Sequence, residues 1–289
     1  MGLPGDGHVH TEWSWDAQGT DGAHAGSMIR TCERAVELGI PAVVFTEHLD
    51  VSPWSVAGKE LTGLDHIRRH VDVHHVLTPP ALDVDGYLAA VAAARERFPR
   101  LRILTGIEFG QPHRATAPTA GSFDRVNGSL HTLRVGGEDL EPPGLFRMWP
   151  AERVMSEYFA ELLRMIEGAQ FDVLSHILYP LRYRPGGAAS FELAAYETEI
   201  RSALRALAER DRALELNTRD ELRSDLLELW IDEGGRAVTF GSDAHSPEQL
   251  GTGLERAAVL AREHGFAPAE DPGAPWRRHG AGSMADSTP

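Results

Sequence analysis

Histidine and carboxylate residues recur along the chain in short patterns that suit metal binding. The first is His8-Val-His10, and the same spacing returns in Asp243-Ala-His245. Two residues at i and i+2 of a β-strand point to the same face, so each pair could reach one ion. The other candidate donors stand singly, at Asp16, His48, Glu108, His131 and His176.

This mixture of donors narrows the choice of ion. Imidazole and carboxylate without thiolate suit zinc, manganese, iron or nickel, and the set is too rich in nitrogen for a calcium or magnesium cage. Nine donors exceed the needs of one ion, whereas about four to six ligands per ion would serve two or three divalent ions. A lone histidine at a strand end is more often a hydrogen-bonded core residue. Six strand ends that carry His, Asp or Glu are a stronger signal, because carboxylates are rarely buried unless paired or metal-bound.

Short apolar runs alternate with longer amphipathic stretches, a pattern that predicts repeated β/α units. We expect seven strands and six helices, with no helix assigned to the fourth strand. The strands are expected at 6–10, 42–46, 101–108, 125–131, 171–176, 213–217 and 237–241. The helices are expected at 27–38, 86–98, 152–168, 191–210, 221–234 and 254–264.

Nearly every predicted strand ends in a candidate metal ligand or a strong acid. The carboxyl ends of parallel strands in a barrel meet at one rim, so scattered sequence positions become one site. Three stretches interrupt the pattern, at 49–85, 109–124 and 132–151, and each follows a strand. We therefore expect these insertions on the same rim as the donors.

Length and composition favour one α/β domain. A chain of 289 residues is long enough to bury a core without disulfides, and its single cysteine, Cys32, is expected to be a structural thiol. Residues 1–268 are predicted to form the domain, and residues 269–289, rich in Pro, Gly, Ser and Ala, a flexible C-terminal tail. Absence of a disulfide and of a long apolar run favours a cytoplasmic protein without a membrane segment.

The charge balance limits the partners. With 28 basic and 43 acidic residues, the net charge is −15, which disfavours stable nucleic-acid binding. A small phosphorylated substrate remains compatible with this charge if the site supplies its own positive charge.

The motifs together resemble those of the PHP family, named for polymerase and histidinol phosphatase, and more closely its histidinol-phosphatase branch. The resemblance extends from residue 6 to about residue 266. It rests on His8-Val-His10, Asp16, Thr46-Glu47-His48, Gly106-Ile-Glu108, Gly128-Ser-Leu-His131, Leu174-Ser-His176 and Gly241-Ser-Asp243-Ala-His245.

The resemblance implies a distorted (β/α)7 barrel, related to the TIM barrel, with a centre of three metal ions. One ion would be held by His8, His10, Glu108 and Asp243. Glu108 would bridge to a second ion on His131 and His176, and a third would lie on Asp16, His48 and His245. Some relatives have His where Asp16 stands. Among these ligands, Glu108, Asp243 and His245 are expected to act in catalysis.

The resemblance also implies a reaction, namely hydrolysis of L-histidinol phosphate by a hydroxide that the ions supply, as part of histidine biosynthesis. Arginines in this part of the relatives hold the substrate phosphate, which points to Arg182 and Arg219. The alternative for both arginines is a surface ion pair, since Asp220 and Glu221 are close in sequence.

Other functions stay open at this point. The substrate could be another small phosphate ester or a nucleotide, and the chain could be a metal hydrolase of the amidohydrolase or TatD type. The common dinuclear amidohydrolase site needs a carbamylated lysine at a strand end, but the single lysine, Lys59, lies in the first insertion. A non-catalytic domain is disfavoured because all nine donor positions hold competent ligands.

Overall fold

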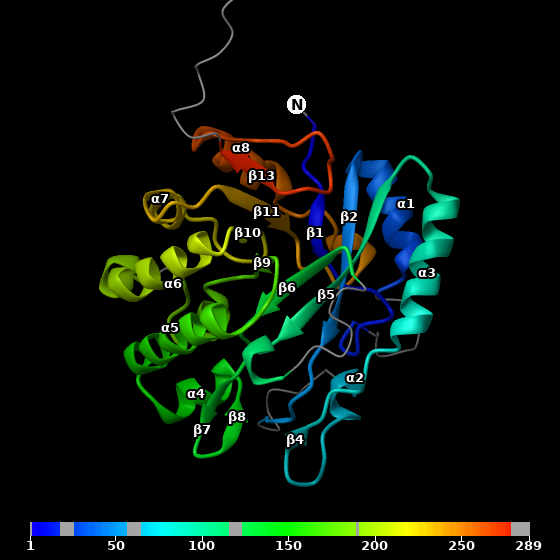
Figure 1. The fold of residues 1–289 in the computed structure, drawn as a ribbon. Helices are drawn as coiled ribbons and strands as arrows, with labels where there is room; N and C mark the ends of the chain where they lie inside the picture. Colours follow the sequence, from blue (N-terminus) through cyan, green and yellow to red (C-terminus); the bar gives the residue numbers. More distant parts are fainter. Residues whose placement is uncertain (1, 18–25, 57–64, 116–122, 189–190, 279–289) are drawn as a thin grey trace, which may run out of the picture.

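A computed structural model describes residues 2–17, 26–56, 65–115, 123–188 and 191–278 of the chain. The residues form a curled, mostly parallel sheet with helices on its outer side (Figure 1). The predicted single α/β domain is therefore confirmed. Lys59 lies outside the described residues.

The main sheet has nine strands, of which the first seven in spatial order pair in parallel. After β11, the chain returns to β1. Val9 forms a parallel bridge with Ala244, and the backbone N–H of His10 donates to the Ala244 carbonyl at 2.8 Å. The two ends of the parallel array thus meet. In spatial order the strands are β1 (Asp6–Val9), β2 (Ala42–Leu49), β5 (Arg102–Gly110), β6 (Arg125–Ser129), β9 (Val173–Leu174), β10 (Ala213–Asn217), β11 (Ala237–Gly241), β13 (Trp276–Arg278) and β12 (Phe266–Ala267).

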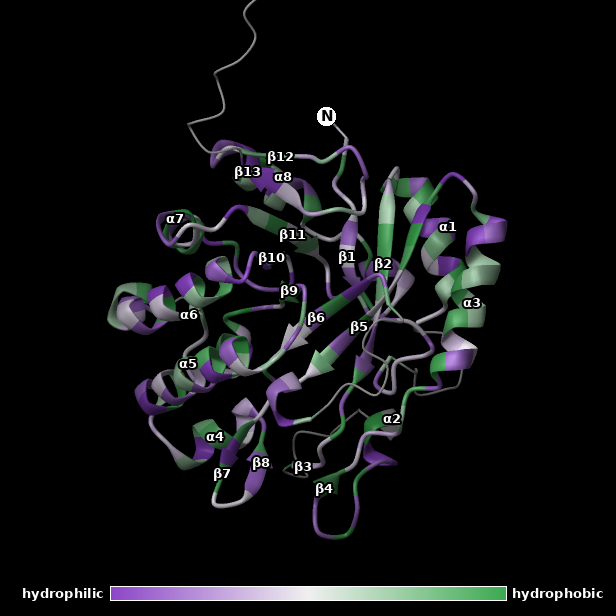
Figure 2. Ribbon diagram, viewed as in Figure 1, coloured by the Kyte–Doolittle hydropathy of each residue, from purple (hydrophilic) through white to green (hydrophobic). Residues whose placement is uncertain are grey.

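Amphipathic helices cover the outside of the sheet. Local sequence fixes their ends: the Ser27 hydroxyl accepts from the N–H of Arg30, and Gly39 ends the first helix at φ 71°, a conformation that favours glycine. Hydrophilic and hydrophobic residues alternate along α5 and α6 (Figure 2), as such helices require. The covering helices are α1 (Met28–Leu38), α3 (Val84–Arg97), α5 (Ala151–Gly168), α6 (Glu197–Glu209), α7 (Ser224–Asp232) and α8 (Leu254–Glu263), while α2 (Asp65–Arg68) and α4 (Pro142–Met148) lie in the first and third insertions.

The β/α alternation departs from a strict repeat. Between β5 and β6 the described residues contain only a short 3-10 helix, η2 (Pro112–Arg114), so the exact (β/α)7 count is not confirmed. The helix predicted at 191–210 begins only at Glu197, after the 3-10 helix η5 (Leu193–Tyr196). The strand predicted at 171–176 shortens to β9, because the backbone of His176 turns to φ 23° and leaves the extended conformation.

Two of the predicted insertions join in a small second sheet. Its order is β4 (Val76–Leu77), β3 (Trp54–Ser55), β8 (Glu138–Leu140) and β7 (Leu133–Val135). The first insertion supplies β3 and β4, and the third supplies β7 and β8. Figure 1 shows the arrowheads of β2, β5 and β6 pointing toward this region, so the insertions lie beyond the carboxyl ends of the strands.

The C-terminal boundary needs a correction. Trp276–Arg278 form β13, which pairs antiparallel with β11 and β12, although residues 269–289 were expected to be a flexible tail. The Trp276 side chain is buried and its ring lies edge-on to that of Phe240, with centroids 4.7 Å apart. The ordered sheet therefore includes residues up to 278, and residues 279–289 lie outside the described part of the chain.

The main core lies between the sheet and the helices. Phe45 of β2 and Tyr87 of α3 are completely buried there, as are Phe159 of α5 and Trp230 of α7. The Tyr87 hydroxyl donates to the Phe45 carbonyl at 2.8 Å and accepts from the N–H of Gly106 at 2.9 Å. This polar contact fixes α3 against two strands that both lead to the site. Cys32 is buried in the same core, as expected of a structural thiol.

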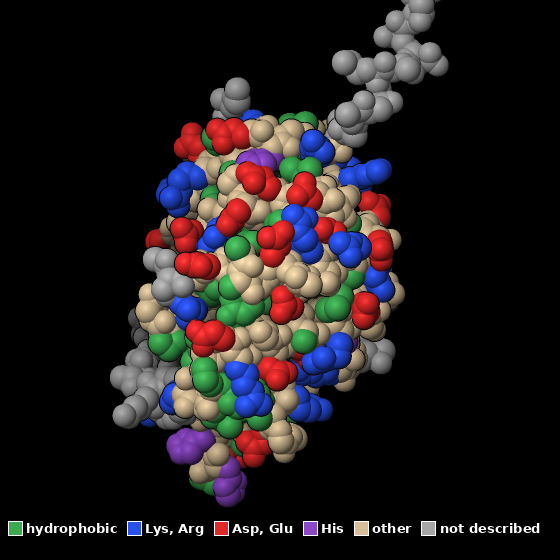
Figure 3. Space-filling model, turned by 90° about the vertical axis from the view of Figure 1, so that its left-hand side faces the viewer, with side chains coloured by type: hydrophobic (Ala, Val, Ile, Leu, Met, Phe, Trp, Pro, Cys, Tyr) green, Lys and Arg blue, Asp and Glu red, His purple; other side chains and the backbone are tan. Residues whose placement is uncertain are grey.

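The outer face that carries α5, α6 and α7 is covered by charges of both signs. Figure 3 shows acidic and basic side chains interspersed across it rather than gathered into one patch. Arg201 of α6, for example, donates to Glu197 at 2.7 Å and to Glu233 at 2.8 Å. Partly exposed surface pairs of this kind each contribute about 0–1 kcal/mol.

None of the helices in the described residues combines the length and the apolar content that a membrane crossing requires.

Candidate metal centre

The nine predicted donors come together at the carboxyl ends of the parallel strands, with Glu108 at the centre. Glu108 Oε2 lies 3.1 Å from His8 Nε2 and 3.3 Å from His10 Nε2. Its other oxygen, Oε1, lies 3.1 Å from His131 Nε2 and 2.6 Å from His176 Nε2. One buried carboxylate thus faces two pairs of histidines, which is the arrangement expected of a bridging ligand.

His8, His10 and Asp243 form a buried group on one side of Glu108. The Nε2 atoms of the two histidines face each other at 3.1 Å, and Asp243 Oδ1 lies 3.6 Å from His10 Nε2. One ligand atom from each residue lies within 4.8 Å of the others, close enough to share one ion.

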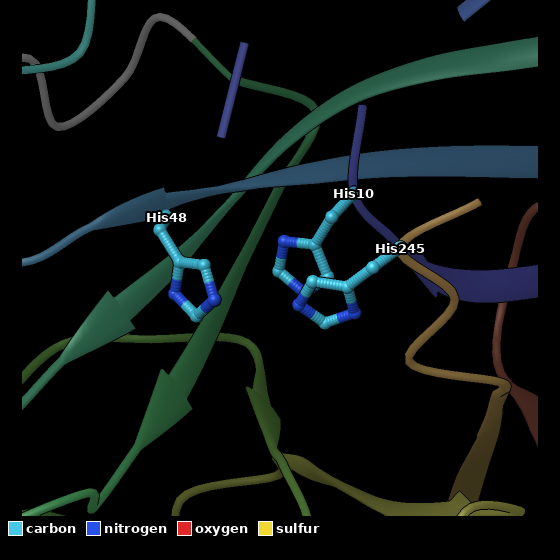
Figure 4. Close-up of side chains that lie close together, drawn as sticks. All are labelled: His10, His48 and His245. Atoms are coloured by element: carbon cyan, nitrogen blue, oxygen red, sulfur yellow. The ribbon is translucent and has the colours of Figure 1, made fainter. Parts of the chain in front are cut away.

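A third group contains Asp16, His48 and His245. Asp16 Oδ2 lies 3.2 Å from His48 Nε2 and 3.0 Å from His245 Nε2. Figure 4 shows the rings of His48 and His245 gathered around His10, and the ring of His10 stacks on them with centroid distances of 4.4 and 4.3 Å. These residues come from the end of β2 and from the segments that follow β1 and β11.

The donor set fits a group of divalent ions. Four atoms at the centre are buried without any hydrogen-bond partner: Asp16 Oδ1, His48 Nδ1, Asp50 Oδ1 and His176 Nδ1. Unpartnered polar atoms are costly to bury. Cations bound among these donors would satisfy buried lone pairs that have no hydrogen-bond partner, and the mixture of nitrogen and oxygen suits zinc, manganese or iron.

The pKa values reflect the mutual stabilisation of imidazole and carboxylate. Burial alone would raise the pKa of Glu108, but His8, His48 and His131 outweigh it and hold this pKa well below its usual value. Burial would likewise lower the pKa of His131, yet Glu108 and Asp50 raise it to about 9. The centre is therefore rich in charge, and its charges compensate one another.

Two ligand residues have an uncommon backbone conformation. His176 and Asp243 adopt φ values of 23° and 53°, in a region that residues with a Cβ atom rarely occupy. Such local strain is typical of functional sites and persists only where surrounding contacts impose it. One of these contacts is the N–H of Asp243, which donates to the carbonyl of His8 at 2.9 Å.

A cavity of about 500 Å³ opens onto the centre. Seven of the nine donors line it, while His8 and His10 lie behind them and are fully buried. Trp54 and Leu77 of the first insertion form part of its wall, and Glu141 and Pro143 contribute from the third. The predicted place of these insertions on the catalytic rim is confirmed.

Both predicted arginines line this cavity, but they are held differently. Arg182 donates to Asp243 Oδ2 at 2.8 Å and to Asn217 Oδ1 at 3.2 Å, and it also pairs with Asp220. The Arg219 side chain is 53% exposed, and its Nη1 lies 3.6 Å from Asp243 Oδ1. Arg182 is therefore the more firmly placed of the two. Their role as phosphate ligands stays a prediction.

Asp50 belongs to the site but was not predicted. It forms a buried group with His48 and His131, and the Trp15 indole N–H donates to its Oδ2 at 3.1 Å. His48 and Asp50 have the i, i+2 spacing of the other two ligand pairs, which was the available signal. It was missed because strand two was expected to end at residue 46, whereas β2 continues to Leu49.

One family model and several known proteins match this chain. The PHP domain family model matches residues 6–219. The probable histidinol-phosphatase of Clostridium acetobutylicum is 24% identical, with 91% of this chain and 94% of the relative covered. The histidinol-phosphatase of Lactococcus lactis is also 24% identical, with 90% and 91% covered.

A solved structure shares the fold. It is the crystal structure of histidinol phosphate phosphatase from Lactococcus lactis, complexed with zinc, L-histidinol and phosphate. The TM-score is 0.72 at 23% identity, and the match covers 92% of this chain and 95% of the other. The family match spans most of this chain and includes seven of the nine donors, from His8 to His176. This chain belongs to the PHP domain family.

Proposed function

We propose that the protein is a metal-dependent phosphomonoesterase that hydrolyses L-histidinol phosphate to L-histidinol and phosphate. The observation that carries the proposal is the convergence of the nine donors, with Glu108 at their centre, at a cavity that Arg182 also lines. The names of the two similar histidinol-phosphatases support the choice of substrate.

In this proposal, the donor side chains bind the metal ions and Arg182 binds the phosphate. The imidazoles and carboxylates would hold two or three divalent ions, zinc, manganese or iron, on one side of the phosphate. When bound, such ions stabilise negative charge and lower the pKa of a water molecule. The Arg182 guanidinium, placed by acidic partners, presents a planar fork suited to phosphate oxygens. The insertions that wall the cavity limit the access of bulk water.

Charge explains how an acidic protein accepts a phosphate. Three of the predicted ligands are carboxylates, Asp16, Glu108 and Asp243, and Asp50 adds a fourth negative charge, so three divalent ions would still leave the centre positive before a hydroxide joins it. The net charge of −15 over the whole chain is thereby reversed locally. We further propose a cytoplasmic location and a small phosphorylated metabolite as the partner.

The test is a phosphate-release assay with chelated and metal-restored protein. L-Histidinol phosphate is compared with other sugar, amino-alcohol and nucleotide monophosphates, and an amide and single-stranded DNA test the amidohydrolase and TatD alternatives. We expect chelation to abolish activity, manganese or zinc to restore it, and histidinol phosphate to give the highest kcat/KM. Activity that is indifferent to chelation would overturn the metal-dependent reaction. A higher kcat/KM for another ester would overturn only the substrate.

A further inference from the structure

Strand β10 contributes none of the nine donors, yet it places two buried polar residues behind the centre. Glu215 and Asn217 have the i, i+2 spacing that puts both on the same face of the strand, and they are 3% and 4% exposed. A buried carboxylate needs strong partners to offset the cost of its desolvation. The hydrogen-bond partners of Glu215 and Asn217 indicate the role of the two residues.

Glu215 contacts both histidine groups that face Glu108. Its Oε1 lies 2.7 Å from His8 Nδ1, the ring nitrogen that points away from the centre. Its Oε2 accepts from the backbone N–H of His176 at 2.9 Å. Glu215 therefore directs the Nε2 lone pair of His8 inward and helps to hold His176 at its positive φ.

Asn217 continues the chain of contacts toward the arginine. Its Nδ2 donates to Glu215 Oε2 at 3.0 Å, and its Oδ1 accepts from Arg182 Nη2 at 3.2 Å. The same oxygen accepts from the N–H of Arg219 at 3.0 Å. Asn217 thus fixes one side of the guanidinium whose other side faces Asp243.

We propose that Glu215 and Asn217 are positioning residues with separate tasks. Glu215 sets the orientation and basicity of the histidine ligands, and Asn217 sets the place of Arg182 in the cavity. Neither residue lines the cavity, so each acts through its neighbour. The task of Glu215 concerns metal binding alone, whereas the task of Asn217 rests on the proposed function, in which Arg182 receives the phosphate.

The test compares four variants for their binding of zinc and of inorganic phosphate. Glu215→Gln keeps the size of the side chain and removes its charge, and Asn217→Ala removes all three contacts of the amide. Glu161→Gln serves as the matched control, because it neutralises a partly buried carboxylate that contacts His113, Arg114 and Arg164 instead of the centre. Zinc affinity is measured by competition with a chromophoric chelator, and inorganic phosphate binding to the zinc-loaded protein by calorimetry.

We expect Glu215→Gln to weaken zinc binding by about 10- to 100-fold, as loss of such outer partners typically does. Asn217→Ala should retain the zinc affinity of the wild type and bind inorganic phosphate roughly 10-fold more weakly. Glu161→Gln should change neither. Glu215→Asp, which restores the charge on a shorter side chain, should recover part of the zinc affinity.

The roles proposed for Glu215 and for Asn217 can be contradicted independently. Wild-type zinc affinity in Glu215→Gln, or an equal loss in Glu161→Gln, would overturn the task of Glu215. Should Glu215→Gln not fold, Glu215→Asp decides the same question. A zinc affinity of Glu215→Asp that equals the affinity of the wild type or of Glu161→Gln would overturn the task of Glu215. Weakened zinc binding in Asn217→Ala, or unchanged phosphate binding, would overturn the task of Asn217. The zinc measurements do not depend on the substrate, so they separate this proposal from the failure of histidinol phosphate as a substrate.

Discussion

The Nη1 atom of Arg182 lies 2.8 Å from Oδ2 of Asp243, so a candidate phosphate ligand and a candidate metal ligand are in direct contact. Arg182 also contacts Asp220 and Asn217, and its side chain is 14% exposed. Three acceptors therefore hold the guanidinium in place before a substrate enters. Such preorganisation reduces the entropy that must be lost when the phosphate binds.

The first prediction concerns this guanidinium. Arg182→Lys keeps the charge but removes the planar fork, so we expect kcat/KM for a phosphate monoester to fall by about 100-fold. Arg219→Lys is the matched control, since Arg219 is half exposed and has one long contact with Asp243; we expect a fall of less than about 10-fold there. Steady-state kinetics of both zinc-loaded variants gives the comparison. Equal losses would show that Arg182 has no special role.

Metal removal should lower thermal stability as well as activity. Ligands that bind only the folded protein stabilise it by about 3–4 kcal/mol at 100 to 1,000 times their Kd. We expect the chelated protein to unfold at a lower temperature in calorimetry and the loss to be reversed by zinc. His10→Ala should lose most of this zinc-dependent shift. His264→Ala should keep it, because the ring of His264 contacts Ser224 and the carbonyl of Leu260, away from the centre.

Gly110 is expected to tolerate no larger residue. A Cβ atom at this position would clash with Asp50 Oδ1, so Gly110→Ala must displace the carboxylate. We expect a loss of about 1–3 kcal/mol in the free energy of unfolding, together with weaker zinc binding. Gly168→Ala is the control, since its added Cβ would meet the Cβ of His113 at an ordinary 3.6 Å. Urea unfolding of both variants tests the difference, and equal stability would contradict it.

Glu161 should give the protein a pH-dependent part of its stability. Burial would raise its pKa, but hydrogen bonds from His113, Arg114 and Arg164 outweigh burial and hold the pKa well below the usual 4.5. A carboxylate with a lowered pKa stabilises the folded state above its unfolded pKa, and this contribution is lost as the pH falls through the folded value. Glu161→Gln should therefore cost about 2 kcal/mol at pH 7.

The cost of Glu161→Gln should shrink steadily once the pH falls below about 4.5. Urea unfolding of both proteins between pH 7 and pH 3 measures the difference. A difference that is constant over this range, or that grows toward low pH, would show that the carboxylate is not held in its charged form.

The last prediction tests the C-terminal strand. Trp276→Ala should lower the free energy of unfolding by about 3–5 kcal/mol, because the indole is buried against Phe240 and β13 pairs with β11. Met148→Ala is a suitable control, since Met148 is 57% exposed and its loss should change stability by less than about 0.5 kcal/mol. A neutral Trp276→Ala would mean that the chain segment after residue 268 contributes little.

The sequence was sufficient to predict the donors because strand ends are marked by chemistry as well as by position. Glu108 and Asp243 each end a mostly apolar run, and buried carboxylates at such places need a partner. Glu215 escaped prediction because it lies within a strand. From the sequence alone, an acidic residue in an apolar run does not reveal which histidine it will face.

The C-terminal strand and the small rim sheet were not predicted, because both depend on contacts between segments far apart in the sequence. The segment before Trp276 is rich in Pro and Gly and therefore predicted a tail, yet two residues of β11 offer a free edge that β13 covers. The strands of the small rim sheet have only two or three residues, too few to show an alternating pattern. Their pairing depends on contacts between two insertions far apart in the chain.

The bridge between Val9 and Ala244 has a consequence for biogenesis. His10 and His245 come from opposite ends of the fold, so ligands made first and ligands made last must meet in one centre. A nascent chain would expose its first histidines long before their partners leave the ribosome. Closing so long a loop is entropically unfavourable. An ion bound between the two ends would hold them together, so metal binding would complete the folding of the enzyme after its synthesis ends.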